Sequence, residues 1–130
     1  MPSSKKAILT QHAPAPIGPY SQAIRHGQML FCSGQVPIDP ATGQIREGAT
    51  VEEYTRQVLE NLGAVLKEAG ANFDQIVKTT IFLKNMGDFP RVNEVYGSYF
   101  KGTPPARSTI EVARLPKDAI VEIEAIAVID

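Results

Sequence analysis

Apolar residues recur every three or four positions over residues 50–70, which predicts an amphipathic helix. The apolar stripe consists of Val51, Tyr54, Val58, Leu62, Val65 and Ala69. Thr50 and Glu53 match a capping box at the start of this helix, in which each side chain accepts a hydrogen bond from a backbone N–H group. Gly70 follows the last apolar position, where a residue in the left-handed conformation commonly ends a helix.

A shorter helix is predicted after Asp88, which we expect to act as its N-cap. Its apolar stripe consists of Phe89, Val92, Val95, Tyr96 and Tyr99. Between the two helices lies the β-branched run Ile76–Leu83, which predicts a strand.

The remaining apolar runs predict five further strands. They cover residues 6–10, the two arms of a hairpin within residues 20–38 that turns at His26 and Gly27, a segment from Ser108, and residues 119–129. Further turns are expected at residues 39–43 and 116–118. The order is β-β-β-α-β-α-β-β, so residues 1–130 are expected to form one α+β domain, a mixed sheet with both helices on one face.

The last predicted strand has two unequal faces. Its odd positions from Ala119 to Ile129 are all apolar and should pack beneath the helices. Its even positions are Ile120, Glu122, Glu124, Ile126 and Val128. That mixture suits neither a core face nor a solvent face, and both helices are already assigned to the other side. We therefore expect a second copy of the chain to cover it.

Composition narrows the class of protein. The chain has 43% hydrophobic residues, a formal net charge of -1 and a pI near 6.1, so overall charge gives nucleic-acid binding no support. Cys32 is the single cysteine, and His12 and His26 lack the spacing of a zinc site, so we expect neither a disulfide nor a metal site. Glycine-rich nucleotide motifs and apolar runs long enough for a membrane span are missing. These features favour a cytoplasmic protein without a cofactor.

Arg107 is the first candidate for chemistry. It follows Pro104 and Pro105, which stiffen the loop, and a guanidinium on a rigid support binds a carboxylate through two hydrogen bonds. A solvated surface arginine is the alternative. Hairpin pairing of the last two strands would bring Glu122 near Arg107, either as a structural ion pair or as a proton-transfer group. Glu124 points to the same face as Glu122, and the sequence leaves open which of the two acts.

Four other residues are weaker candidates. Tyr20 follows a rigid Gly-Pro turn, Ser33 and Gly34 end a strand, and Asn93 lies beside the second apolar stripe. Each has an ordinary structural explanation: a packed tyrosine, a Ser-Gly turn and a solvated asparagine.

Five blocks of the chain, in order, resemble the RidA (YjgF) family of imine deaminases. They are "IGPYSQA", "SGQVPIDP", "VKTTIFLKNMGDFPRVNEVY", "PPARSTIEVARLP" and "VEIEAIAV". The resemblance extends from about Ala13 to Val128. It implies a chorismate-mutase-like fold, a homotrimer with sites at the subunit interfaces, and no metal or organic cofactor.

The resemblance also implies an activity. The substrates would be 2-iminopropanoate and 2-iminobutanoate, formed from 2-aminoacrylate and 2-aminocrotonate that pyridoxal-phosphate enzymes release, and the products 2-oxo acids and ammonia. Arg107 would bind the substrate carboxylate, and Glu122 would hold water and transfer protons. The pocket would be lined by Tyr20, Ser33, Gly34, Asn93 and the backbone of Thr109. Many relatives have cysteine at this last position, so a thiol-dependent role does not carry over.

Two other functions are compatible with the same residues. One is a regulator that binds 2-oxo or 2-imino acids without catalysis, and the other is a holdase-like chaperone. Translation inhibition and RNA cleavage have also been attributed to members of the family, and the near-neutral charge supports neither. The presence of both Arg107 and Glu122 favours the enzyme, because a regulator needs no proton-transfer group.

Overall fold

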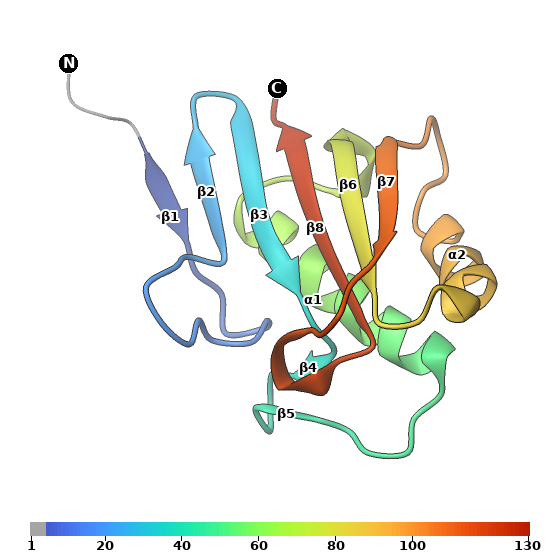
Figure 1. Ribbon diagram of the computed structural model, residues 1–130. Coiled ribbons are helices and arrows are strands. Elements are labelled where there is room, and N and C mark those ends of the chain that lie inside the picture. Colours follow the sequence, from blue (N-terminus) through green and yellow to red (C-terminus); the bar gives the residue numbers. More distant parts are fainter. Residues whose placement is uncertain (1–4) are drawn as a thin grey trace.

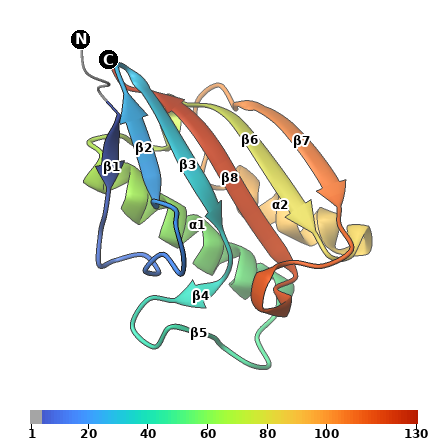
Figure 2. The same cartoon turned by 60° about the vertical axis from the view of Figure 1, so that its left-hand side comes forward.

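The computed structural model describes residues 5–130 and contains a six-stranded mixed sheet in the order β1–β2–β3–β8–β6–β7 (Figure 1). Its strands are β1 (Lys6–Ile8), β2 (Ala23–His26), β3 (Met29–Gln35), β6 (Ile76–Leu83), β7 (Ala106–Glu111) and β8 (Val121–Val128). Helices α1 (Val51–Glu68) and α2 (Phe89–Gly97) lie on one face of this sheet (Figure 2). The α+β class and the predicted order of the main elements are therefore confirmed.

A small hairpin, β4 (Ile38–Asp39) with β5 (Gln44–Ile45), interrupts that order between β3 and α1. It is built on the turn predicted at residues 39–43. Asp39 accepts hydrogen bonds from the N–H groups of Ala41 and Gly43, and Gly43 has a φ of +74°. The turn was therefore predicted correctly, whereas the two short strands beside it were not predicted.

Helix α1 begins and ends where its sequence predicts. Thr50 Oγ1 accepts a hydrogen bond from the Glu53 N–H at 3.1 Å, and the Glu53 carboxylate accepts one from the Thr50 N–H at 2.9 Å, so the capping box is complete. Gly70 has a φ of +79°, the left-handed conformation expected after the helix. Leu59, Leu62 and other apolar residues of α1 are fully buried against the sheet, which anchors the helix.

The core lies between the helices and the sheet, and β8 is central to it. The odd residues Val121, Ile123, Ala125 and Ala127 are all at most 3% exposed. The even residues of β8 are half-buried or exposed and lie on the face without helices. Phe31 and Ile110 lie on this same open face and are 45% and 44% exposed. The predicted division of the last strand into two faces is thus confirmed.

The start of α2 differs from the prediction. A short 3₁₀ turn, Met86–Asp88, precedes the helix, and Asn85 caps this turn by accepting a hydrogen bond from the Gly87 N–H. Asp88 occupies the N-cap position of α2 as predicted, but it has helical dihedral angles and its side chain makes no capping hydrogen bond, so the predicted capping role is wrong. The Asp88 carboxylate pairs instead with Arg91. The helix ends at Gly97.

The predicted pairing of the last two strands is also wrong. Strand β6 lies between β7 and β8, pairing with β7 in parallel and with β8 antiparallel. The β6–α2–β7 segment forms a crossover connection, which makes the neighbouring strands parallel. Arg107 pairs with Thr79 and Glu122 pairs with Phe82, so a whole strand separates the two candidates.

Candidate active site

Arg107 is held between two aromatic rings of α2. Its guanidinium carbon lies 5.1 Å from the ring centroids of both Phe89 and Tyr96, a cation–π arrangement. Its Nη1 donates a hydrogen bond to Asn93 Oδ1 at 2.7 Å. These three contacts orient an otherwise exposed guanidinium, and within residues 5–130 Asn93 is its one hydrogen-bond acceptor.

The local sequence explains this arrangement. Phe89, Asn93 and Tyr96 are spaced four and three residues apart, so one side of α2 presents all three toward the edge of β7. Tyr96 is buried, and its hydroxyl hydrogen-bonds Thr79 Oγ1 at 2.6 Å, beside the register position of Arg107. Burial raises the pKa of Tyr96, and the Thr79 hydrogen bond and the Arg107 charge oppose that rise.

Glu122 lies in a separate cleft of about 660 Å³. The cleft is lined by Ile17, Tyr20, Ser33, Gly34, Val36, Ile38, Pro116, Lys117 and Glu122. Burial raises the pKa of the Glu122 carboxyl above its ordinary value, and the negative charge of Glu124 raises it further. A carboxylate with a raised pKa is a stronger base than an ordinary one, which suits a group that accepts and returns a proton.

A β-bulge in β3 brings the backbone of Gly34 against Glu122. The β3–β8 register shifts between Cys32 and Gln35, where β3 has one more residue than β8. A Cβ atom on Gly34 would lie against Glu122 Oε2 and 2.8 Å from Glu122 Cδ, so glycine is the residue that leaves room for the carboxylate. Ser33, also in the bulge, donates a hydrogen bond to the Ser21 carbonyl at 2.6 Å.

Tyr20 lies on the loop after β1, which Gln22 holds in place. Gln22 is 1% exposed; its Oε1 accepts from the Thr10 N–H at 2.7 Å, and its Nε2 donates to the carbonyls of Thr10 and Pro14. Tyr20 itself is 53% exposed and adjoins the Glu122 cleft. The role of Gln22 was not predicted, because burial of a lone glutamine in "YSQA" has no sequence signal.

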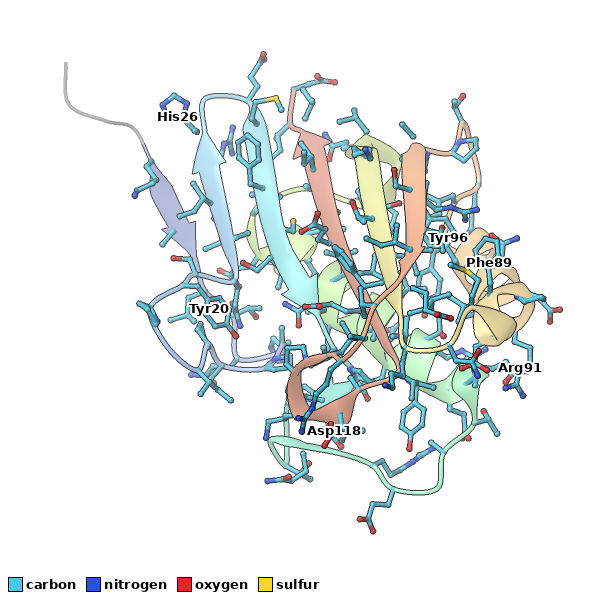
Figure 3. The ribbon with its side chains drawn as sticks, in the orientation of Figure 1. Tyr20, His26, Phe89, Arg91, Tyr96 and Asp118 are labelled. Atoms are coloured by element: carbon cyan, nitrogen blue, oxygen red, sulfur yellow. The ribbon has the colours of Figure 1, made fainter. Side chains whose placement is uncertain are left out.

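The structure thus divides the predicted site residues into two groups on opposite faces of the sheet. The first cluster lies on the helical face and consists of Arg107, Asn93 and Thr109. The second cluster lies around the cleft of Glu122 and consists of Tyr20, Ser33, Gly34 and Glu122. Figure 3 shows Phe89 and Tyr96 beside α2 and Tyr20 far from them, on the loop below β1 and β2. One chain does not bring Arg107 and Glu122 together.

The structural ion pair considered for Arg107 and Glu122 is therefore wrong for the single chain. Ion pairs of the described residues include Arg46 with Glu53, Arg91 with Asp88 and Arg114 with Asp118. Glu124 is exposed on the same open face as Glu122, outside the residues that line the cleft.

Other features of the described residues lie apart from both groups. Cys32 is buried, and burial raises the pKa of its thiol to about 12, as expected for an unreactive core cysteine. Over residues 5–130, histidine, cysteine, aspartate and glutamate side chains do not gather into a group of metal ligands, and the helices there are too short or too polar to cross a membrane. A larger hollow of about 820 Å³ over α1 contains none of the predicted site residues.

Comparisons with known proteins support one family. The family model described as endoribonuclease L-PSP matches residues 10–129. A RutC family protein of Pyrococcus horikoshii is 54% identical, over 95% of this chain and 97% of the relative. A mouse protein named 2-iminobutanoate/2-iminopropanoate deaminase is 52% identical, over 95% and 91% of the two chains. The crystal structure of Escherichia coli TdcF with bound serine has a TM-score of 0.92 and 46% identity, covering 97% of this chain and all of that one.

Proposed function

Because the chain belongs to the endoribonuclease L-PSP family, which is the YjgF/RidA family, we propose that it hydrolyses 2-imino acids to 2-oxo acids and ammonia. The substrates are 2-iminopropanoate and 2-iminobutanoate. The proposal rests on two side chains. The Arg107 guanidinium lies against the rings of Phe89 and Tyr96, and the half-buried Glu122 carboxyl has a raised pKa. The mouse and rat relatives named as deaminases support the same reaction.

We propose further that each site forms between two copies of the chain. The two groups lie on opposite faces of the sheet, so a site that uses both must take Arg107 from one copy and Glu122 from another. The open face of the sheet also exposes Phe31 and Ile110, which a second copy would cover. A closed ring of copies repeats this heterologous contact, and we propose a homotrimer.

Arg107 and Glu122 have complementary roles in the proposed reaction. The Arg107 fork binds the substrate carboxylate through two hydrogen bonds, which selects 2-imino acids over neutral imines. Glu122 accepts a proton from a water molecule as the water oxygen attacks the imine carbon, and it returns that proton to the nitrogen, which gives a carbinolamine. Glu122 then carries the proton of the new hydroxyl group to the amine nitrogen as the C–N bond breaks, so that ammonia leaves and the 2-oxo acid remains. Since imines also hydrolyse unaided, a modest acceleration is sufficient.

The proposed setting is the cytoplasm, beside pyridoxal-phosphate enzymes that release enamines from serine and threonine. The test generates 2-iminobutanoate with a threonine dehydratase and follows its decay, together with 2-oxobutanoate formation, with and without this protein. We expect faster imine decay in its presence. If the imine decays at the unaided rate although the protein binds pyruvate, the regulator that binds 2-oxo acids without catalysis is favoured. A protein that neither accelerates imine decay nor binds pyruvate would contradict the proposed function.

A further inference from the structure

Gln22 is a buried polar side chain outside the predicted site residues. It is 1% exposed. Its Oε1 accepts a hydrogen bond from the Thr10 N–H at 2.7 Å. Its Nε2 donates to the carbonyls of Thr10 at 3.0 Å and Pro14 at 2.9 Å, with a longer contact to the Ala13 carbonyl at 3.4 Å. The amide thus uses its acceptor and both of its donor hydrogens on the loop between β1 and β2.

This loop depends on a side chain for support because it lies outside the sheet. Residues 9–22 connect β1 to β2, and they include Pro14, Pro16 and Pro19, which have no N–H group to donate. The Gln22 amide pairs with the loop backbone as a neighbouring strand would. An apolar side chain of the same length would fill the volume of Gln22 but leave buried backbone groups unpaired.

Gln22 also connects the loop to the β-bulge of β3. Its carbonyl accepts a hydrogen bond from the Ser33 N–H at 3.0 Å, and the carbonyl of Ser21 accepts one from the Ser33 hydroxyl at 2.6 Å. Gly34, the next residue of the bulge, lies against the Glu122 carboxylate. Gln22 therefore joins two walls of the cleft that contains Glu122.

Tyr20 is the cleft residue whose position depends most directly on this support. It lies two residues before Gln22, on the loop below β1 and β2 (Figure 3), and lines the Glu122 cleft. Its Oη accepts a hydrogen bond from the Ile17 N–H at 3.4 Å, and no acceptor within residues 5–130 binds its own O–H proton. The phenol can therefore donate one hydrogen bond to a molecule in the cleft.

We infer that Gln22 is a positioning residue for imine hydrolysis, an inference that rests on the proposed function. It fixes the loop so that the Tyr20 hydroxyl donates to the imine nitrogen beside Glu122, while Arg107 of another copy binds the substrate carboxylate. Loss of the Gln22 amide should then lower kcat and leave pyruvate affinity nearly unchanged. A glutamine with a structural role alone would affect stability and the amount of folded protein, but not turnover per folded site.

The test is a double-mutant cycle of Gln22→Met and Tyr20→Phe, with 2-iminobutanoate turnover, pyruvate affinity and Tm measured for each protein. Tyr20→Phe should lower kcat by about tenfold, as for loss of one hydrogen bond. Gln22→Met should lower kcat by about tenfold in the parent, but by less than about twofold in Tyr20→Phe, where the hydroxyl that it positions is already missing. Gln28→Met is the matched control and should keep parental kcat, since Gln28 is exposed on the turn between β2 and β3.

Parental kcat in folded Gln22→Met or Tyr20→Phe would overturn the inference, and so would equal fold losses from Gln22→Met in the two backgrounds. Imine turnover by the parent protein leaves the proposed function standing in these cases. A parent protein that does not accelerate imine hydrolysis overturns the proposed function and this inference with it.

Gln22→Glu replaces Gln22→Met if the methionine variant does not fold. A protonated carboxyl of this shape can donate one hydrogen bond to the loop, whereas the ionised form donates none and places a negative charge against the loop carbonyls. Turnover of Gln22→Glu relative to the parent should therefore fall as pH rises. A ratio that stays constant with pH would overturn the inference.

Discussion

Arg107 and Glu122 lie on opposite faces of the same sheet, because their partners on β6, Thr79 and Phe82, are an odd number of residues apart. Arg107 is clamped against α2, and Glu122 adjoins the cleft that Tyr20 lines. A site that uses both groups therefore requires two chains, and this requirement can be tested without a structure of the assembly.

Subunit mixing tests the shared site directly. At substrate concentrations far below the KM of Arg107→Lys, the variants Arg107→Lys and Glu122→Gln should each be nearly inactive alone. After the two variants are mixed in equal amounts, unfolded and refolded together, random assembly into a ring gives about one site in four with both parental groups. We expect about a quarter of the parental activity. If mixed rings assemble properly but show no recovered activity, a site shared between copies is contradicted.

Arg107→Lys should lose most activity and remain folded. Lysine keeps the positive charge but loses the planar fork that grips a carboxylate and stacks between Phe89 and Tyr96. Steady-state kinetics should show the loss mainly as a higher KM, and thermal unfolding should show a Tm close to that of the parent. A lysine variant with parental KM would remove Arg107 from carboxylate binding.

Glu122→Gln should lower turnover by roughly 10²–10⁴-fold, the range typical of general acid–base groups. Glutamine keeps the volume and hydrogen-bonding capacity but accepts no proton from water. Pyruvate affinity should change little, because Arg107 supplies most of it. Near-parental turnover in a folded Gln variant would contradict the role of Glu122 and leave Glu124 or solvent as the proton carrier.

The same substitution should change how stability depends on pH. The pKa of Glu122 is raised in the folded chain, so the stability that this group contributes is present below its ordinary pKa of 4.5 and is lost as pH rises through the folded pKa. Glu122→Gln avoids that loss. Its Tm should equal or exceed the parental Tm at about pH 7.5, and the difference should shrink toward about pH 4. A variant less stable than the parent at neutral pH would indicate a structural role for the carboxylate.

Gly34→Ala should reduce activity by displacing the Glu122 carboxylate, because the added Cβ would lie against Oε2. The displaced group is the end of a flexible side chain, so the protein should still fold. Gly102→Ala is the matched control, since a Cβ there has no neighbour within 4 Å. Imine turnover and Tm of both variants check this expectation, and equal activity of the two would show that the carboxylate position is not critical.

Local features of the fold were predictable, and long-range pairing was not. The capping box at Thr50, the left-handed Gly70 and the strand Ile76–Leu83 depend on neighbouring residues, and all three were predicted correctly. The capping role of Asp88 was wrong although Asp88 occupies the N-cap position, because Asn85 and a 3₁₀ turn precede α2 and the Asp88 carboxylate pairs with the side chain of Arg91. Pro90, in the first turn of α2, has no N–H group for Asp88 to cap.

The arrangement of the site depended on strand order. The short turn before β8 predicts a hairpin with β7, whereas the strand–helix–strand succession of β6, α2 and β7 predicts a parallel crossover. The structure contains the crossover, with β6 between β7 and β8. Phe89 and Tyr96 were assigned to an apolar stripe, and their contact with Arg107 follows only once β7 is placed beside β6.

The hydrogen bonds of Gln22 fix the loop that carries Tyr20, and they should be insensitive to pH and ionic strength. Every group in these hydrogen bonds is uncharged: the Gln22 amide, the N–H of Thr10, and the carbonyls of Thr10, Ala13 and Pro14. Such bonds neither titrate nor weaken by ionic screening. Acid or salt should therefore leave the loop in place, and a pH profile measured at this end of the site reports the protonation of Glu122 rather than movement of the scaffold around it.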